Sequence, residues 1–201
     1  DSQEDFAKNV VGEIGNVKSG RVSLENYEST TMKPEDFRVV YDEYENFLRR
    51  CGKIDFDDML VFTYELLSER PDILKMWQNK FRYILIDEFQ DINMIQYDIV
   101  KMLAGERQNV FSVGDDDQSV YGFRGAAPAI MKKFPEDFHG TVIEYLNVNY
   151  RCSYDIVECS KRIIQNNRDR YEKQLRSAFA AGQSDRVHIV KTDSMTEQNK
   201  K

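Results

Sequence analysis

Residues 83–91 read YILIDEFQD, an apolar, β-prone run that passes directly into two carboxylates. Short apolar runs bounded by polar residues favour a buried strand. Asp87 and Glu88 would then lie at the carboxyl end of that strand, where they could hold a metal ion, begin a helix or face water. A helix start needs only one oxygen acceptor, so the additional Gln90 and Asp91 favour a ligand site over a simple cap.

Further along the chain, apolar runs alternate with helical patterns. The expected strands are residues 82–87, 109–114, 141–146 and 186–190, and the expected helices are residues 93–104, 128–134 and 153–167. Strands that alternate with helices are typical of a parallel sheet covered on both faces. The fold class expected for this part of the chain is therefore α/β.

The part of the chain before residue 83 reads as helical. Apolar residues recur at spacings of three and four in the first 30 residues, and Pro34 opens a second helix that Gly52 ends. Asp55 can cap a third helix over FDDMLVFTYELLSE, and Pro71 starts a fourth. The DFDD run is therefore interpreted as a helix start rather than a metal site.

The composition is that of a globular chain: 41% of the 201 residues are hydrophobic and 31% are charged. No apolar run approaches the roughly 18 residues of a membrane helix, and the first residues do not resemble a signal peptide. Three cysteines without a CxxC pair suggest reduced thiols, and hence the cytoplasm. Two histidines far apart argue against a zinc site.

The charge is distributed unevenly along the chain. Residues 1–119 carry 14 Lys and Arg against 25 Asp and Glu, whereas residues 120–201 carry 14 against 10. The first part therefore has a net charge of −11 and the second a net charge of +4, which together make the −7 of the whole chain. A polyanion such as DNA would prefer the C-terminal part.

Three of the expected strand ends carry unusual polar groups. They are Asp87, Glu88, Gln90 and Asp91 after the first strand, Gly114, Asp115, Asp116, Asp117 and Gln118 after the second, and Asn147, Asn149, Tyr150 and Arg151 after the third. Ligands of open parallel sheets bind at the carboxyl ends of strands. If the strands are neighbours, these groups build one cleft that contains carboxylates, a glutamine and an arginine.

An apolar strand that ends in Asp-Glu is the Walker B arrangement. In it the Asp reaches Mg²⁺, usually through water, and the Glu polarises an attacking water molecule. The pattern alone is not specific, because acidic residues also follow strands as helix caps.

Three motifs make the pattern specific. YILIDEFQD, VFSVGDDDQSVYGFRGA and LNVNYRC resemble motifs II, III and IV of the UvrD/Rep-type superfamily 1 DNA helicases, and GKIDFDDML is similar to another segment found there. The resemblance extends in order and spacing over about residues 34–180. It implies a partial RecA-like P-loop NTPase motor domain, with a parallel sheet flanked by helices, behind an N-terminal helical segment.

The resemblance also implies roles for single residues. Asp87 and Glu88 match the acids that bind Mg²⁺ and activate water. Gln118 matches a glutamine that senses the terminal phosphate of ATP and links it to DNA contacts. Arg151 matches an arginine on the γ-phosphate, and Tyr150 matches a tyrosine that stacks on the adenine.

The end of motif III implies a contact with single-stranded DNA. Tyr121, Phe123 and Arg124 match this region, in which an aromatic side chain stacks on a base. Phe123 stands where tryptophan is more usual, which should weaken the stacking without abolishing it. Without the resemblance, both aromatic side chains would be expected to pack beneath a loop.

One motif of the family is missing. No GxxxxGK[ST] sequence, the Walker A loop that binds phosphates, occurs in the chain, and neither do the later motifs of the second motor domain. The chain therefore resembles an internal piece of a helicase. Residues 1–50 resemble part of helical subdomain 1B, residues 51–146 the second half of motor domain 1A, and residues 147–201 the start of motor domain 2A.

The function expected is that of a fragment of an ATP-dependent 3′→5′ DNA helicase. The fragment alone should be inactive, and it could self-associate through an exposed sheet edge. One alternative is a metal-dependent nuclease or phosphohydrolase whose carboxylates would be Asp87, Glu88, Asp91 and Asp115. Another is a non-catalytic interaction module, for which changes at Asp87 or Glu88 would leave binding unaffected.

Overall fold

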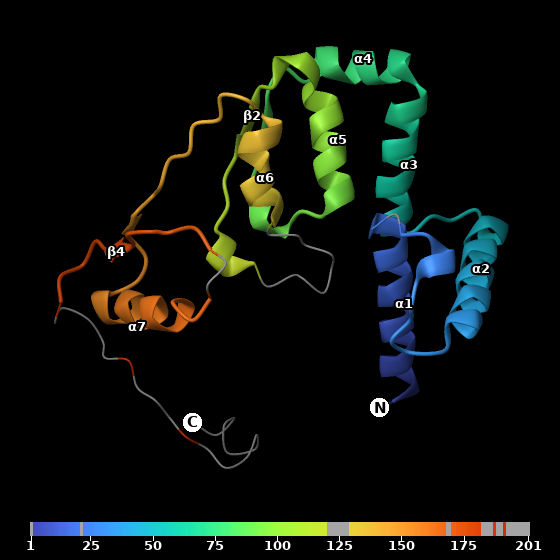
Figure 1. Ribbon diagram of the computed structural model, residues 1–201, viewed down its shortest axis with the longest axis horizontal. Helices are drawn as coiled ribbons and strands as arrows, with labels where there is room; N and C mark the ends of the chain where they lie inside the picture. Colours follow the sequence, from blue (N-terminus) through green and yellow to red (C-terminus); the bar gives the residue numbers. More distant parts are fainter. Residues whose placement is uncertain are drawn as a thin grey trace. The chain divides into compact units, whose positions relative to one another are not determined.

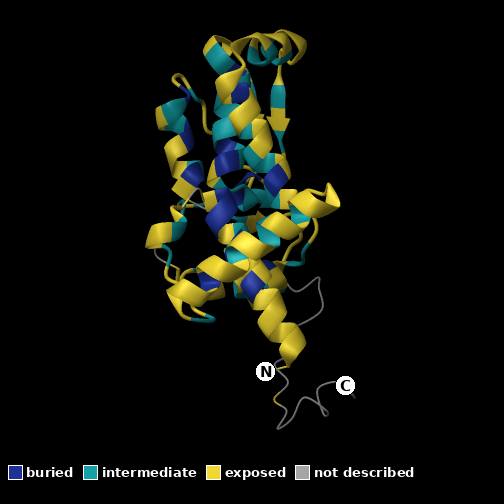
Figure 2. Ribbon diagram, turned by 90° about the vertical axis from the view of Figure 1, so that its right-hand side faces the viewer, coloured by how far each residue is buried: buried dark blue, intermediate teal, exposed yellow. Residues whose placement is uncertain are grey.

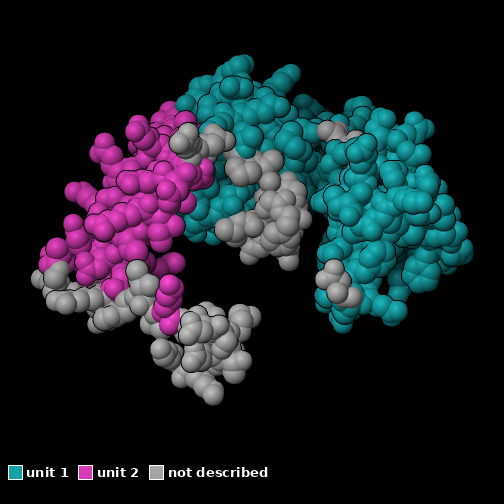
Figure 3. All heavy atoms as spheres, turned by 60° about the horizontal axis from the view of Figure 1, so that its bottom comes forward, with its two compact units in different colours: residues 1–141 teal, residues 142–201 magenta. Residues whose placement is uncertain are grey.

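The computed structural model describes residues 2–20, 22–119, 129–167 and 170–181, together with residues 187 and 191. The chain divides into two compact units, residues 1–141 and 142–201, which Figure 3 colours teal and magenta. Within the described ranges, every helix is too short or too polar to cross a membrane.

Two helices form the first part of unit 1. Helix α1 spans Gln3–Gly20 and α2 spans Pro34–Cys51, as Pro34 predicts. Gly52 ends α2 at a φ of 61°, a left-handed conformation that glycine adopts without steric cost. A small core lies between the two helices. It contains Val10, Ile14, Val17 and Phe37.

Two shorter helices follow, as the sequence predicts. Helix α3 spans Phe56–Glu69 and α4 spans Pro71–Lys80 (Figure 1). The Asp55 carboxylate accepts the Asp58 backbone N–H at 2.7 Å, and the Asp58 carboxylate accepts the Asp55 N–H at 3.0 Å. This reciprocal capping box confirms the DFDD run as a helix start.

A parallel pair of strands forms the sheet of unit 1. Strand β1 spans Ile84–Ile86 and β2 spans Val110–Ser112, with Leu85 opposite Phe111. Helix α5, Met94–Ala104, connects them and begins at an Asn93–Gln96 capping box. Helix α6, Ala129–Asp137, follows β2, and 3₁₀ turns cover Phe89–Asp91, Gly105–Arg107 and Asp116–Gln118.

Helices cover one face of this sheet. Its core contains Phe89, Tyr97, Ala104, Ile130, Phe134 and Phe138, with Ile84, Ile86 and Val110 packed against them. Figure 2 colours the ribbon by burial, with buried stretches in dark blue. On the opposite face Leu85 is 73% exposed and Phe111 is 62% exposed. The expectation of a sheet covered on both faces is therefore wrong for the described part of unit 1, because α5 and α6 both pack against the same face.

Unit 2 contains a second parallel pair. Strand β3, Val148–Asn149, pairs with β4, Arg176–Ser177, and α7 spans Tyr154–Ile164. The strand expected at residues 141–146 is wrong: this segment has no regular structure, and Leu146 is 87% exposed. A strand needs a neighbouring strand for its hydrogen bonds, and none of the described residues pairs with this segment. The strand expected at residues 186–190 falls, apart from Val187, outside the described residues.

Candidate functional site

The carboxyl ends of β1 and β2 lie side by side. The ladder continues past both strands, because the Val113 N–H donates to the Ile86 carbonyl and the Phe89 N–H donates to the Val113 carbonyl, each at 2.9 Å. The polar residues after β1 and those after β2 therefore meet at one edge, as expected for a parallel sheet.

Asp87 and Glu88 are both exposed at this edge. The Asp87 carboxylate accepts the Glu88 backbone N–H at 2.9 Å. Glu88 has a φ of 50° and a ψ of 44°, a left-handed conformation that is uncommon outside glycine. Such strained backbone is typical of functional sites, where the surrounding structure holds a side chain in a required position.

Gln90 connects the two strand ends. Its side chain, in a residue only 2% exposed, donates from Nε2 to Glu88 Oε2 at 2.7 Å, while its Oε1 accepts the Asp115 backbone N–H at 2.9 Å. The sequence pattern favoured a ligand site near Gln90 but indicated no role for the glutamine itself. The available signal was an amide two residues beyond a pair of carboxylates.

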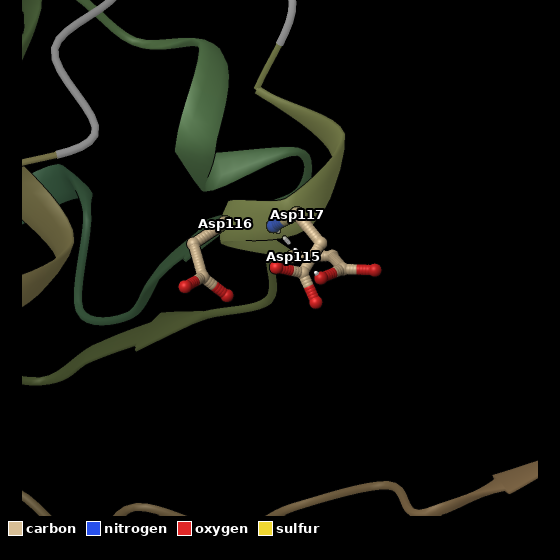
Figure 4. Close-up of side chains that lie close together, drawn as sticks. All are labelled: Asp115, Asp116 and Asp117. Atoms are coloured by element: carbon tan, nitrogen blue, oxygen red, sulfur yellow. Dashed lines mark hydrogen bonds between the residues drawn. The ribbon is translucent and has the colours of Figure 1, made fainter. Parts of the chain in front are cut away.

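Asp115 organises the turn after β2. Its carboxylate accepts the Gln118 Nε2–H at 2.7 Å and the Asp117 backbone N–H at 3.2 Å, so each oxygen has a donor. The carboxylates of Asp115, Asp116 and Asp117 leave this one turn, with ligand atoms within 4.8 Å of one another (Figure 4). The hydrogen bonds explain the Asp115 position as a cap of the short 3₁₀ turn.

The four-carboxylate cluster of the nuclease alternative is not formed. The structure describes all four residues of that alternative, Asp87, Glu88, Asp91 and Asp115. Among the described residues, however, the one group of three or more possible metal ligands that lie close together is Asp115, Asp116 and Asp117. Of the four residues in the nuclease alternative, only Asp87 and Glu88 are exposed. This donor type suits Mg²⁺, which prefers oxygen ligands and keeps several waters.

Tyr150 and Arg151 follow strand β3 in unit 2. The Asn149 side chain accepts the backbone N–H groups of Arg151 and Cys152, at 2.9 and 2.8 Å, and so shapes the turn that carries them. Tyr150 is 77% exposed, Arg151 is exposed too, and no ion pair of Arg151 is found among the described residues. Both side chains are available for a ligand.

Tyr121, Phe123 and Arg124, the residues expected to contact DNA, lie outside the described residues.

Comparison with known proteins identifies the family. Residues 2–139 match the UvrD/REP helicase N-terminal domain. The chain is 47% identical over 139 residues to the putative ATP-dependent DNA helicase YjcD of Bacillus subtilis, a match that covers 69% of this chain and 18% of that protein.

Two further relatives are ATP-dependent DNA helicases. The match to Rep of Escherichia coli is 40% identical over 146 residues, 73% of this chain and 22% of Rep. The match to PcrA of Staphylococcus epidermidis is 35% identical over 204 residues, 99% of this chain and 27% of PcrA. The chain thus spans about a fifth to a quarter of the length of these relatives. It belongs to the UvrD/REP helicase family, matching the N-terminal domain of its members.

Proposed function

We propose that this chain forms part of the motor of an ATP-dependent 3′→5′ DNA helicase. The observation that carries the proposal is the network at the ends of β1 and β2, in which Glu88, Gln90, Asp115 and Gln118 are joined by hydrogen bonds. The names of the relatives, which are ATP-dependent DNA helicases, support it.

Each residue of the site has a chemical task in this proposal. Asp87 and Glu88 would hold Mg²⁺, which would supply positive charge to neutralise the phosphate oxygens. The Glu88 carboxylate accepts a proton from the attacking water. Gln118 contacts the terminal phosphate from the turn after β2, and so links the state of the nucleotide to the DNA contacts.

Two residues of unit 2 have roles in the proposal as well. The Arg151 guanidinium stabilises negative charge on the γ-phosphate in the transition state, and the Tyr150 ring stacks on the adenine. Tyr121, Phe123 and Arg124 bind single-stranded DNA by stacking and charge. In domain terms, residues 1–50 belong to subdomain 1B, residues 51–146 to the RecA-like motor domain 1A, and residues 147–201 to motor domain 2A. We infer a cytoplasmic location, because the bacterial relatives are ATP-dependent DNA helicases.

The test uses a hybrid helicase, defined as Staphylococcus epidermidis PcrA with its matching region replaced by residues 1–201. This relative is suitable because its match covers 99% of the chain. We expect DNA-stimulated ATP hydrolysis and unwinding of a duplex with a 3′ single-stranded tail. A hybrid helicase that melts cooperatively and binds ATP, yet hydrolyses none, would contradict the proposal. Unwinding only from a 5′ tail would contradict the polarity.

A further inference from the structure

We propose that Gln90 is a positioning residue, which holds the Glu88 carboxylate in place and links it to the turn that carries Asp115 and Gln118. This inference rests on the proposed function, because it explains how the water-activating carboxylate keeps its orientation. It assigns a task to a buried side chain that contacts neither nucleotide nor DNA in that proposal.

The hydrogen bonds of Gln90 leave its amide one orientation. A carboxylate only accepts and a backbone N–H only donates, so the NH₂ group must face Glu88 and the carbonyl oxygen must face Asp115. The two distances, 2.7 Å to Glu88 Oε2 and 2.9 Å from the Asp115 nitrogen, are those of well-formed bonds. Both ends of a planar group are therefore fixed.

The backbone around Gln90 confines the amide further. A Cβ atom placed on Gly114 would lie 2.8 Å from Gln90 Oε1 and 3.2 Å from the Gln90 backbone nitrogen. The contact with Oε1 would force the amide to move, and the backbone nitrogen would also have to give way slightly. Glycine at position 114 thus gives the amide the space that it occupies between the strand ends.

The Gln90 amide donates to the side chain of Glu88, a residue whose backbone is in a strained conformation. Glu88 has a φ of 50°, and its carbonyl accepts the Asp91 N–H at 2.9 Å. The Gln90 amide engages Oε2, so Oε1 is the oxygen that remains for an attacking water. A chain of contacts then runs from Gln118 through Asp115 and Gln90 to Glu88. A shift of the turn after β2 is thereby transmitted to the carboxylate.

Two substitutions of Gln90 distinguish the effects of its two hydrogen bonds, the one to Glu88 and the one from the Asp115 N–H. Gln90→Glu keeps an acceptor for the Asp115 N–H but replaces the donor with a carboxylate that repels Glu88. Gln90→Met keeps the size of the side chain and removes both bonds. The matched control is Gln78→Met, since Gln78 also donates an amide bond, at 2.7 Å to the Met102 carbonyl, away from the strand ends.

The first measurement is steady-state ATP hydrolysis by the hybrid helicase. We expect both Gln90 variants to lower kcat by about 10- to 100-fold, the range found when a hydrogen-bond partner that orients a metal ligand is removed. The KM for ATP should change less than about threefold. Gln78→Met should leave kcat within about twofold. A lower kcat in the Gln78→Met variant, or an unchanged kcat in both Gln90 variants, would overturn the proposal.

The second measurement needs no catalysis and uses the 201-residue chain itself. Hydrogen exchange of the Asp115 amide should accelerate at least tenfold in Gln90→Met and remain near the original rate in Gln90→Glu. An Asp115 amide that exchanges at the same rate in all variants would refute the link between the strand ends. If the unaltered hybrid helicase were inactive while the exchange results held, the proposed function would fail and the link would stand.

Gly114→Ala provides an independent check, because it alters no polar atom. The added methyl group displaces the Gln90 amide, so this variant should reproduce both the lower kcat and the faster Asp115 exchange of Gln90→Met. Normal turnover by Gly114→Ala would show that the position of the amide does not govern Glu88.

Discussion

Glu88 combines three features at one position: an exposed carboxylate, a left-handed backbone and a hydrogen bond from a buried amide. A left-handed conformation costs a non-glycine residue about 1–3 kcal/mol. Such a conformation persists only where the surrounding structure enforces it, which a merely solvated side chain does not require. The conformation therefore agrees with a carboxylate that must point in one direction.

Replacement of Glu88 by glutamine tests the proton-accepting role. In the hybrid helicase, Glu88→Gln should bind ATP nearly as well as the original and lose at least about 99% of its hydrolysis, because an amide cannot take up the proton of water. Glu69→Gln, at the exposed end of α3, is the control. Binding can be followed with a fluorescent ATP analogue and turnover by phosphate release. Turnover within a few-fold of the original would remove Glu88 from the mechanism.

Arg151 offers a second test at the residue scale. Arg151 is exposed and its guanidinium has no carboxylate partner among the described residues, so Arg151→Ala should not destabilise unit 2. In the hybrid helicase we expect hydrolysis to fall by about 10³-fold or more, the range for arginines that stabilise the transition state of phosphoryl transfer, with little change in ADP affinity. Equal losses of ADP and ATP-analogue affinity would instead make Arg151 a general phosphate anchor.

At the scale of elements, one buried lysine joins three helices. Lys18 on α1 is 4% exposed in its side chain and contacts Glu45 on α2 at 2.5 Å, together with Asp55 and Asp58 at the start of α3, at 2.8 and 2.7 Å. Burial alone would lower the pKa of Lys18, but the three carboxylates raise it well above its usual value. Burial alone would likewise raise the pKa of Asp55, and hydrogen bonds from Lys18, the Asp58 N–H and Tyr44 lower it.

These shifts define the pH range in which the cluster stabilises the fold. A lowered Asp55 pKa gives stability that is present above the unfolded value of about 4 and lost as the pH falls through the folded pKa. A raised Lys18 pKa gives stability that is present below about 10.4 and lost as the pH rises through the folded pKa. The free energy of unfolding should therefore be greatest between these limits.

Lys18→Met should reduce the free energy of unfolding by about 3–5 kcal/mol at pH 7, because it leaves three carboxylates facing one another. Lys8→Met is the control on the same helix, since Lys8 and its partner Glu4 are exposed and such pairs contribute at most about 1 kcal/mol. Urea denaturation at pH 4, 7 and 10 measures both. Equal losses in the two variants would show that the Lys18 cluster contributes no more than a surface pair.

At the scale of the whole molecule, unit 1 exposes an apolar sheet face. Every second residue along β1 and β2 and their ends lies on this face. These residues are between 42% and 73% exposed: Tyr83, Leu85, Phe111 and Val113. Exposed apolar faces and unpaired strand edges recruit other chains. The chain also contains no Walker A sequence, whose N–H groups and lysine would offset the charge of ATP.

We therefore expect the 201-residue chain alone to self-associate and to lack ATP hydrolysis. Light scattering over a concentration series measures the first property, and phosphate release with and without single-stranded DNA measures the second. Leu85→Ser combined with Phe111→Ser should reduce the association without lowering the melting temperature, because both side chains are exposed. A monomeric chain with DNA-stimulated turnover would overturn both expectations.

Features that depend on neighbouring residues are predictable from the amino-acid sequence alone. Pro34 and Pro71 begin helices, Gly52 ends one, and Asp55 caps another, because the hydrogen bonds involved span only a few residues. The alternation of strands and helices predicted a parallel sheet, and β1 and β2 form a parallel pair. The family resemblance was likewise carried by contiguous motifs, which the comparisons confirmed.

Contacts between groups that are distant in the sequence depend on how the elements pack. Residues 141–146 have the pattern of a strand but no partner among the described residues, and pairing depends on the rest of the fold. Gln90 reaches a backbone group 25 residues away, and Lys18 reaches carboxylates 37 and 40 residues away. A local pattern contains no information about such contacts, because packing between elements brings the partners together.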